Sequence, residues 1–231
     1  MVNSHEIRIF GLQRSGIHAL VNWIVQQSAG PTVFINDIKS LTANPYMRRD
    51  IHLQRTNESA PPPLDVKSEL EGNHLPKEYL ILGYEDTDLR QVPVGFDELI
   101  REAVGSSETV TNLLILRDPY NLCASRMRFF NSANRNPMRT RSDYVLGLWK
   151  MHAREELRHT LYLGPNTLVV KYNECFSSPA YRKHIADSTS DPGASSTGVL
   201  MEPNTTAMPT QKMSVFSHLQ EQCCVTSMPT I

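Results

Sequence analysis

A short turn between two glycines is the first segment of this sequence whose residue types and spacing suggest chemistry. The turn runs Gly11-Leu-Gln-Arg-Ser-Gly16 and follows an apolar segment of strand character. Its two glycines allow a tight turn and a close approach of the backbone to a ligand. The helix expected from Ile17 adds free amides and the positive end of its dipole, which together attract anions. Arg14 contributes a fixed positive charge, so the turn predicts binding of a phosphate or a sulfate.

The spacing of the two glycines equals that of a Walker A loop, but the next residues differ. Ile17 and His18 stand where such a loop carries Lys and Ser or Thr. Without that lysine and that hydroxyl, the loop lacks its usual contacts to the β- and γ-phosphates and to Mg²⁺. We therefore expect an anion site and no metal ligand. The candidate binding residues are Gln13, Arg14, Ser15, Gly16, Ile17 and His18.

A second segment, about a hundred residues later, also ends an apolar strand with a cation. Leu113–Leu116 is followed by Arg117, and the pair Asp118-Pro119 is a good start for a helix that would carry Ser125. A guanidinium can donate two hydrogen bonds to one phosphate, and a serine hydroxyl can add a third. A Walker B strand would instead be followed by an aspartate, so this segment also favours an anion over magnesium.

Taken together, the two segments resemble the sulfotransferases that use 3′-phosphoadenosine 5′-phosphosulfate (PAPS). The Gln13–Gly16 turn resembles the 5′-phosphosulfate loop of that family, in which Lys or Arg precedes Ser-Gly. Arg117 and Ser125 are similar to its 3′-phosphate motif and have the same eight-residue separation. Val169–Glu174 resembles a late strand that ends Lys-Tyr-Glu in many members. The resemblance covers roughly residues 5 to 185.

The resemblance implies transfer of a sulfuryl group from PAPS to a hydroxyl or an amine, without a metal. Adenosine 3′,5′-bisphosphate would be the product. Arg14 and the amides of residues 15–18 would stabilise the leaving phosphate, while Arg117 and Ser125 would bind the 3′-phosphate. The acceptor is not identified and is expected to be a carbohydrate, a small alcohol or amine, or a peptide.

The acceptor needs a general base, and Glu85 is the first candidate. It follows the expected strand Tyr79–Gly83, so its carboxylate should lie at the same edge of the sheet as the two anion-binding segments. A carboxylate there could take the proton of the acceptor, as His or Glu does in the family that this chain resembles. His18 and His52 are competing candidates.

Two other functions and several structural interpretations stay open at this point. A Mg²⁺-dependent P-loop kinase or nucleoside triphosphatase would share the fold, and a non-catalytic nucleotide-binding relative would fit the changed Ile17-His18 pair. Arg117 could instead pair structurally with Asp118 or Glu85. A basic group is expected on a solvated face, or alternatively at the entrance for an anionic or sugar acceptor. Its members are Arg126, Arg128, Arg135, Arg139 and Arg141.

Apolar runs of strand length alternate with amphipathic segments along the chain. This alternation predicts a three-layer α/β/α fold with a mainly parallel central sheet, similar to the P-loop nucleotide hydrolases. The expected strands are Glu6–Phe10, Thr32–Ile35, Tyr79–Gly83, Asn112–Leu116 and Thr167–Tyr172, and the expected helices are Ile17–Gln27, Phe96–Val104, Pro119–Phe130 and Ser142–Leu161. In the last helix, one stripe is expected to hold Val145, Leu148, Trp149, His152 and Leu157.

Residues 1–187 are expected to form the sulfotransferase-like domain, and two regions interrupt or follow its pattern. Residues 44–78 contain three successive prolines and few large apolar residues, which is typical of a loop or lid. Residues 188–231 are rich in Ser, Thr, Pro and Met, which predicts a weakly ordered tail.

Composition excludes several classes of protein. The 23 Lys and Arg nearly balance the 24 Asp and Glu, so no global field attracts nucleic acid or an anionic membrane. We expect no membrane span and no signal peptide, because the apolar runs are short and charged residues come early. The four cysteines have neither metal-site nor disulfide-framework spacing. These features predict a cytoplasmic enzyme with reduced thiols.

Overall fold

The computed structural model describes residues 1–47, 51–54, 64–132 and 142–190. The triple proline, the arginines at 135, 139 and 141, and residues 191–231 lie outside the described residues. The weakly ordered tail therefore stays a prediction, as does the role of the segment around the prolines as a lid.

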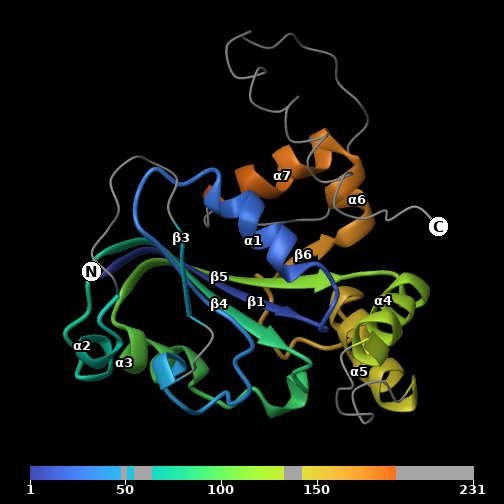
Figure 1. Cartoon of the computed structure of the whole chain (residues 1–231), viewed down its shortest axis with the longest axis horizontal. Helices are drawn as coiled ribbons and strands as arrows, with labels where there is room; N and C mark the ends of the chain where they lie inside the picture. Colours follow the sequence, from blue (N-terminus) through green and yellow to red (C-terminus); the bar gives the residue numbers. More distant parts are fainter. Residues whose placement is uncertain (48–50, 55–63, 133–141, 191–231) are drawn as a thin grey trace, which may run out of the picture. The chain divides into compact units, whose positions relative to one another are not determined.

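A six-stranded sheet in the order β3-β2-β4-β1-β5-β6 forms the centre of the domain (Figure 1). All neighbouring strands are parallel except the pair formed by β2 and β3. The strands are β1 (Asn3–Gly11), β2 (Thr32–Ile35), β3 (Ile51–Gln54), β4 (Lys77–Glu85), β5 (Ser107–Leu116) and β6 (Leu168–Lys171). The predicted fold class, α/β with a mainly parallel sheet, is confirmed.

Helices flank this sheet on both faces (Figure 1). They are α1 (Ile17–Val25), α2 (Val66–Leu70), α3 (Phe96–Val104), α4 (Pro119–Ser132), α5 (Ser142–Glu156), α6 (Tyr172–Ser177) and α7 (Pro179–Ser190), with short 3₁₀ helices η1 (Pro45–Met47) and η2 (Leu89–Gln91). None of the helices in the described part of the chain has the length and apolarity that a membrane crossing requires.

The strands are continuous apolar runs because both faces of the sheet are covered. In β1, Ile7 and Ile9 pack with α1, α6 and α7, while Phe10 packs with α3 on the opposite face. A third cluster joins Leu12, just after β1, to apolar residues of α4 and α5. The end of β1 is thus held from three directions, and this is where the glycine-bounded turn begins.

The described structure corrects some of the expected elements. The stretch expected to be irregular contains η1, the edge strand β3 and α2. The last strand ends at Lys171, and Tyr172 begins α6 instead of extending the strand. Leu157 lies beyond the end of α5 and is 60% exposed, so its place in the buried stripe is wrong. The short elements η1, β3, α2 and α6 bury too few residues to produce a visible apolar period in the sequence.

Strand register brings three chain segments together at the carboxyl edge of the sheet. Gly11 of β1 lies opposite Glu85 of β4 on one side and Ile115 of β5 on the other. The helices that follow β1 and β4, α1 and α3, cover opposite faces of the sheet. Connections that diverge in this way open a crevice between the two strand ends, where α/β proteins bind ligands.

Candidate functional site

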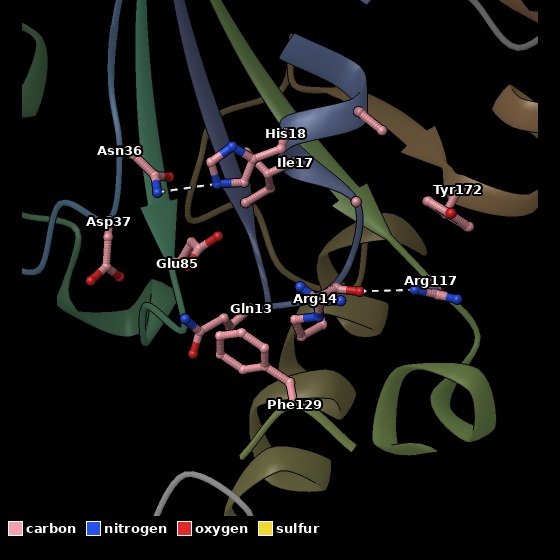
Figure 2. A pocket seen from close by; sticks show the side chains of 12 residues that line it. Gln13, Arg14, Ile17, His18, Asn36, Asp37, Glu85, Arg117, Phe129 and Tyr172 are labelled. Carbon is pink, nitrogen blue, oxygen red and sulfur yellow. Dashed lines mark hydrogen bonds between the residues drawn. The ribbon is translucent and has the colours of Figure 1, made fainter. Parts of the chain in front are cut away.

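A cavity of about 480 Å³ lies at this edge of the sheet (Figure 2). It is lined by seven of the nine residues that sequence reasoning selected, namely Gln13, Arg14, Gly16, Ile17, His18, Glu85 and Arg117. Ser15 and Ser125, the other two, lie beside the cavity without lining it. The structure therefore brings residues of the two predicted anion-binding segments and Glu85 to one cavity.

The turn at the start of α1 is held in an unusual backbone conformation. Gly16 has φ of 105° and Arg14 has φ of 73°, in the left-handed region that side-chain-bearing residues rarely adopt. The Ser15 amide donates to the Leu12 carbonyl at 2.8 Å, which closes the turn. The ring of Tyr172 occupies the position where a side chain on Gly16 would project. Glycine at this position is therefore required both by φ and by the neighbouring ring.

Replacing Gly16 with alanine is expected to lower the free energy of unfolding by about 1–3 kcal/mol, because the left-handed conformation is strained for alanine. The displaced Tyr172 ring should add to this loss. Urea unfolding measures the difference. Gly147→Ala in α5 is the matched control, since nothing lies within 4 Å of the added Cβ and alanine favours a helix. Equal stability of the two variants would contradict the packing of Tyr172 on Gly16.

Arg14 reaches across to α4. Its Nε donates to Ser125 Oγ at 3.3 Å, and its guanidinium carbon lies 4.8 Å from the centre of the Phe129 ring. The two predicted anion-binding segments therefore meet through the side chains of Arg14 and Ser125. Sequence reasoning placed Arg14 and Ser125 in the same site but did not find Phe129, which carries no motif.

Arg117 supports the turn and also faces the cavity. Its Nη1 donates to the Arg14 carbonyl at 3.0 Å, and its guanidinium carbon lies 4.4 Å from the centre of the Tyr172 ring. Among the described residues it forms no ion pair with Asp118 or Glu85, the two structural partners considered for it. Asp118 instead caps α4 by accepting from the Asn121 amide at 2.9 Å.

Two buried donors beside the turn lack a hydrogen-bond partner among the described residues. They are Nε of Arg117 and the hydroxyl of Ser15. Buried polar groups in proteins are rarely left unpaired, because an unpaired group costs about 1–3 kcal/mol. Of these two residues only Arg117 lines the cavity, so an anion bound there would lie beside Arg117.

Glu85 occupies the other side of the cavity and is only 5% exposed. Burial, together with the nearby negative charge of Asp37, raises the pKa of its carboxyl to about 7. Within the described part of the chain, no side chain or amide donates a hydrogen bond to this carboxylate. Lys39 pairs with Asp37 and donates to the backbone carbonyl of Glu85 at 3.2 Å. Glu85 is thus a carboxyl that titrates near neutrality and faces a cavity.

The remaining polar residues on the Glu85 side come from the ends of β2 and the start of α1. Asn36 Nδ2 lies 3.2 Å from His18 Nε2, and the His18 ring packs edge-on against Phe34. Asn36 and Asp37 were missed by the sequence analysis. The signal that could have found them is that they directly follow a parallel strand. The side chain of His52, the other competing base, is not among those that the structure describes.

The cavity is polarised. Figure 2 shows Arg14 and Arg117 toward one end and Asn36 and Asp37 toward the other, with Glu85 between the two groups. In the described ranges, no group of three or more His, Cys, Asp or Glu side chains has an arrangement that could hold a metal ion.

Arg126 is the clearest correction to the sequence analysis. It was expected on a solvated basic face, but its side chain is 1% exposed and forms an ion pair with Asp86. Arg128, two residues later on α4, is exposed as expected. The pattern of charges along α4 did not distinguish the two, because the partner of Arg126 lies 40 residues away in the sequence.

Comparisons with known proteins give a distant structural likeness. No family model and no curated protein matches the sequence. Among solved structures, mouse sulfotransferase SULT7A1 complexed with PAP aligns with a TM-score of 0.43 and 16% sequence identity. The alignment covers 80% of this chain, which spans 64% of the length of that one.

Proposed function

We propose that this chain is a sulfotransferase that moves a sulfuryl group from PAPS to a hydroxyl or amine of an acceptor. The observation that carries the proposal is the polarised cavity. Arg14 and Arg117 lie at one end, and a buried carboxyl with a pKa of about 7 lies on the other side. The motifs in the sequence that resemble the PAPS-dependent family supply the identity of the donor.

The residues present fit such a donor. The cavity volume lies in the range of about 300–1,000 Å³ that is usual for small-molecule sites. The donor's 5′-phosphosulfate would be held by Arg14 and the amides of residues 15–18, and its 3′-phosphate by Arg117 and Ser125. Arg117 supports this assignment, because it lines the cavity beside Arg14 and its Nε has no partner among the described residues.

In the proposed reaction the donor supplies the sulfuryl group and leaves as adenosine 3′,5′-bisphosphate. Ionised Glu85 takes the proton of the acceptor at a carboxylate oxygen as the acceptor attacks in line. Arg14 and the first-turn amides of α1 stabilise the negative charge that develops on the leaving phosphate. Burial of Glu85 brings its pKa to about 7, which suits a general base near neutral pH.

The experiment that tests the proposal is thermal unfolding of the purified chain with adenosine 3′,5′-bisphosphate, AMP or Mg²⁺-ATP. A ligand present at a hundred times its Kd stabilises a protein by about 2.7 kcal/mol. We expect a rise in Tm with the bisphosphate that does not depend on Mg²⁺. A rise with Mg²⁺-ATP alone would indicate a kinase or nucleoside triphosphatase instead. Binding of the bisphosphate without transfer to any acceptor in a broad panel would indicate a non-catalytic relative.

Arg117→Ala is expected to weaken binding of the bisphosphate about ten- to a hundredfold, since charge-assisted hydrogen bonds contribute about 1.5–3 kcal/mol. Isothermal titration calorimetry measures the change in Kd. Arg101→Ala, at an exposed position on α3, removes the same charge away from the cavity and should leave the Kd unchanged. Parental affinity of Arg117→Ala would remove Arg117 from the site.

A further inference from the structure

A buried ion pair joins α4 to the residue that follows β4. Arg126 donates from Nη1 to Asp86 Oδ1 at 2.7 Å and from Nη2 to Asp86 Oδ2 at 3.0 Å. This two-bond arrangement fixes the distance and the orientation of the two groups at the same time. Neither side chain is among the described residues that line the cavity.

The same pair holds both sides of one residue of the anion-binding turn. The Gln13 amide donates to Asp86 Oδ1 at 2.9 Å, and Nη1 of Arg126 donates to the Gln13 carbonyl at 3.0 Å. In addition, the Asp86 amide donates to the Gly11 carbonyl at 3.0 Å. Asp86 adopts this position with φ of 56°, in the left-handed region, which its surroundings must stabilise.

The neighbours of these residues in the sequence carry the proposed reaction. Gln13 directly precedes Arg14, and Asp86 directly follows Glu85. We propose that Asp86 and Arg126 are positioning residues that set the Arg14 turn and the Glu85 carboxylate at a fixed separation. This inference rests on the proposed function. It adds that the distance and orientation between Glu85, the proposed base, and Arg14, which would stabilise the leaving phosphate, depend on an ion pair that touches neither substrate.

A second buried ion pair, which involves the same strand, serves as a control. It distinguishes an effect on the position of the turn from a general loss of stability. Lys77, the first residue of β4, donates to both carboxylate oxygens of Glu69 at 2.9 and 3.0 Å. Both side chains are buried, whereas in the pair at the other end of β4 Arg126 is buried and Asp86 is partly buried. Glu69 does not line the cavity. Loss of either pair should therefore destabilise the domain, but loss of the Asp86–Arg126 pair alone should release the turn.

The first test measures hydrogen exchange in the chain without ligand. Asp86→Asn keeps the volume of the side chain but removes its charge, and Glu69→Gln does the same in the control pair. Each variant is measured the same number of degrees below its own Tm. Under these conditions the amides of residues 12–17 should exchange about tenfold faster or more in Asp86→Asn than in Glu69→Gln. Equal exchange in the two variants would overturn the proposal. Arg126→Lys keeps the charge without the two-bond geometry and gives the same comparison if Asp86→Asn does not fold.

The second test measures binding and turnover. Asp86→Asn and Arg126→Lys should lower kcat roughly ten- to a hundredfold, because small displacements of reacting groups have effects of this size, whereas Glu69→Gln should retain parental kcat. Parental kcat in folded Asp86→Asn would overturn the positioning role. A parent chain that binds no bisphosphate would overturn the proposed function, and hydrogen exchange would still decide whether the pair holds the turn.

Discussion

Replacing Glu85 with glutamine is expected to lower the kcat of sulfuryl transfer about 10²- to 10⁴-fold, the usual contribution of a general base. Glutamine fills nearly the same volume but cannot accept a proton. The Kd for adenosine 3′,5′-bisphosphate should stay close to the parental value, because Glu85 lies away from the arginines that would hold the phosphates. Steady-state turnover at saturating PAPS, together with calorimetry, measures both quantities. Near-parental turnover would exclude Glu85 as the base.

The pH dependence of the parent chain gives an independent check. Because burial raises the pKa of Glu85 to about 7, activity should rise with pH through about 7 as the carboxyl ionises. This rise should be absent from the residual activity of Glu85→Gln. His18→Gln distinguishes the competing base: the rise near pH 7 should persist in that variant. Loss of the rise in His18→Gln and its persistence in Glu85→Gln would assign the base to His18.

Stability should follow the opposite trend with pH. A carboxyl whose pKa is raised by folding stabilises the folded state below its unfolded pKa of 4.5 and loses that contribution as pH rises through about 7. One pKa unit corresponds to about 1.4 kcal/mol, so ionisation of Glu85 should lower the free energy of unfolding by about 3 kcal/mol. Glu85→Gln should therefore gain stability above pH 7 while losing activity. A purely structural role for Glu85 would not predict this combination.

Replacing Arg14 with glycine is expected to lower kcat about 10²- to 10³-fold. This is the usual loss when an enzyme loses one hydrogen-bond donor to a developing oxyanion. Glycine is the informative replacement because Arg14 has φ of 73°, a conformation that strains alanine but not glycine. The loss should therefore reflect the missing guanidinium and not a distorted turn. Turnover with PAPS measures the effect, and circular dichroism with urea unfolding checks the fold.

Two further variants define what Arg14 contributes. Arg14→Lys keeps the positive charge and should recover part of the lost kcat. Ser125→Ala removes the hydroxyl to which Arg14 Nε donates and should have a smaller effect, since the Phe129 ring still packs against the guanidinium. If Arg14→Gly reduced binding of the bisphosphate without reducing kcat, the guanidinium would serve ground-state binding only.

The sequence by itself determined the fold class and the strand ends at which the candidate site lies. Apolar runs with helices between them require a parallel sheet covered on both faces, and the ends of parallel strands must share an edge. The glycine-bounded turn, Arg117 and Glu85 each follow such a run, so their meeting at one cavity could be predicted from local patterns. The short elements β3 and α6 could not be predicted, because they bury too few residues to produce a period.

Only the tertiary structure decided how the charged residues are paired and buried. The sequence does not distinguish Arg126 from Arg128, yet one is enclosed with Asp86 and the other is exposed to solvent. Likewise, the pKa of Glu85 depends on its burial and on the charge of Asp37, a residue that follows another strand, β2. Secondary structure follows from neighbouring residues, whereas desolvation and ion pairing depend on residues that are distant in the chain and meet only when it folds.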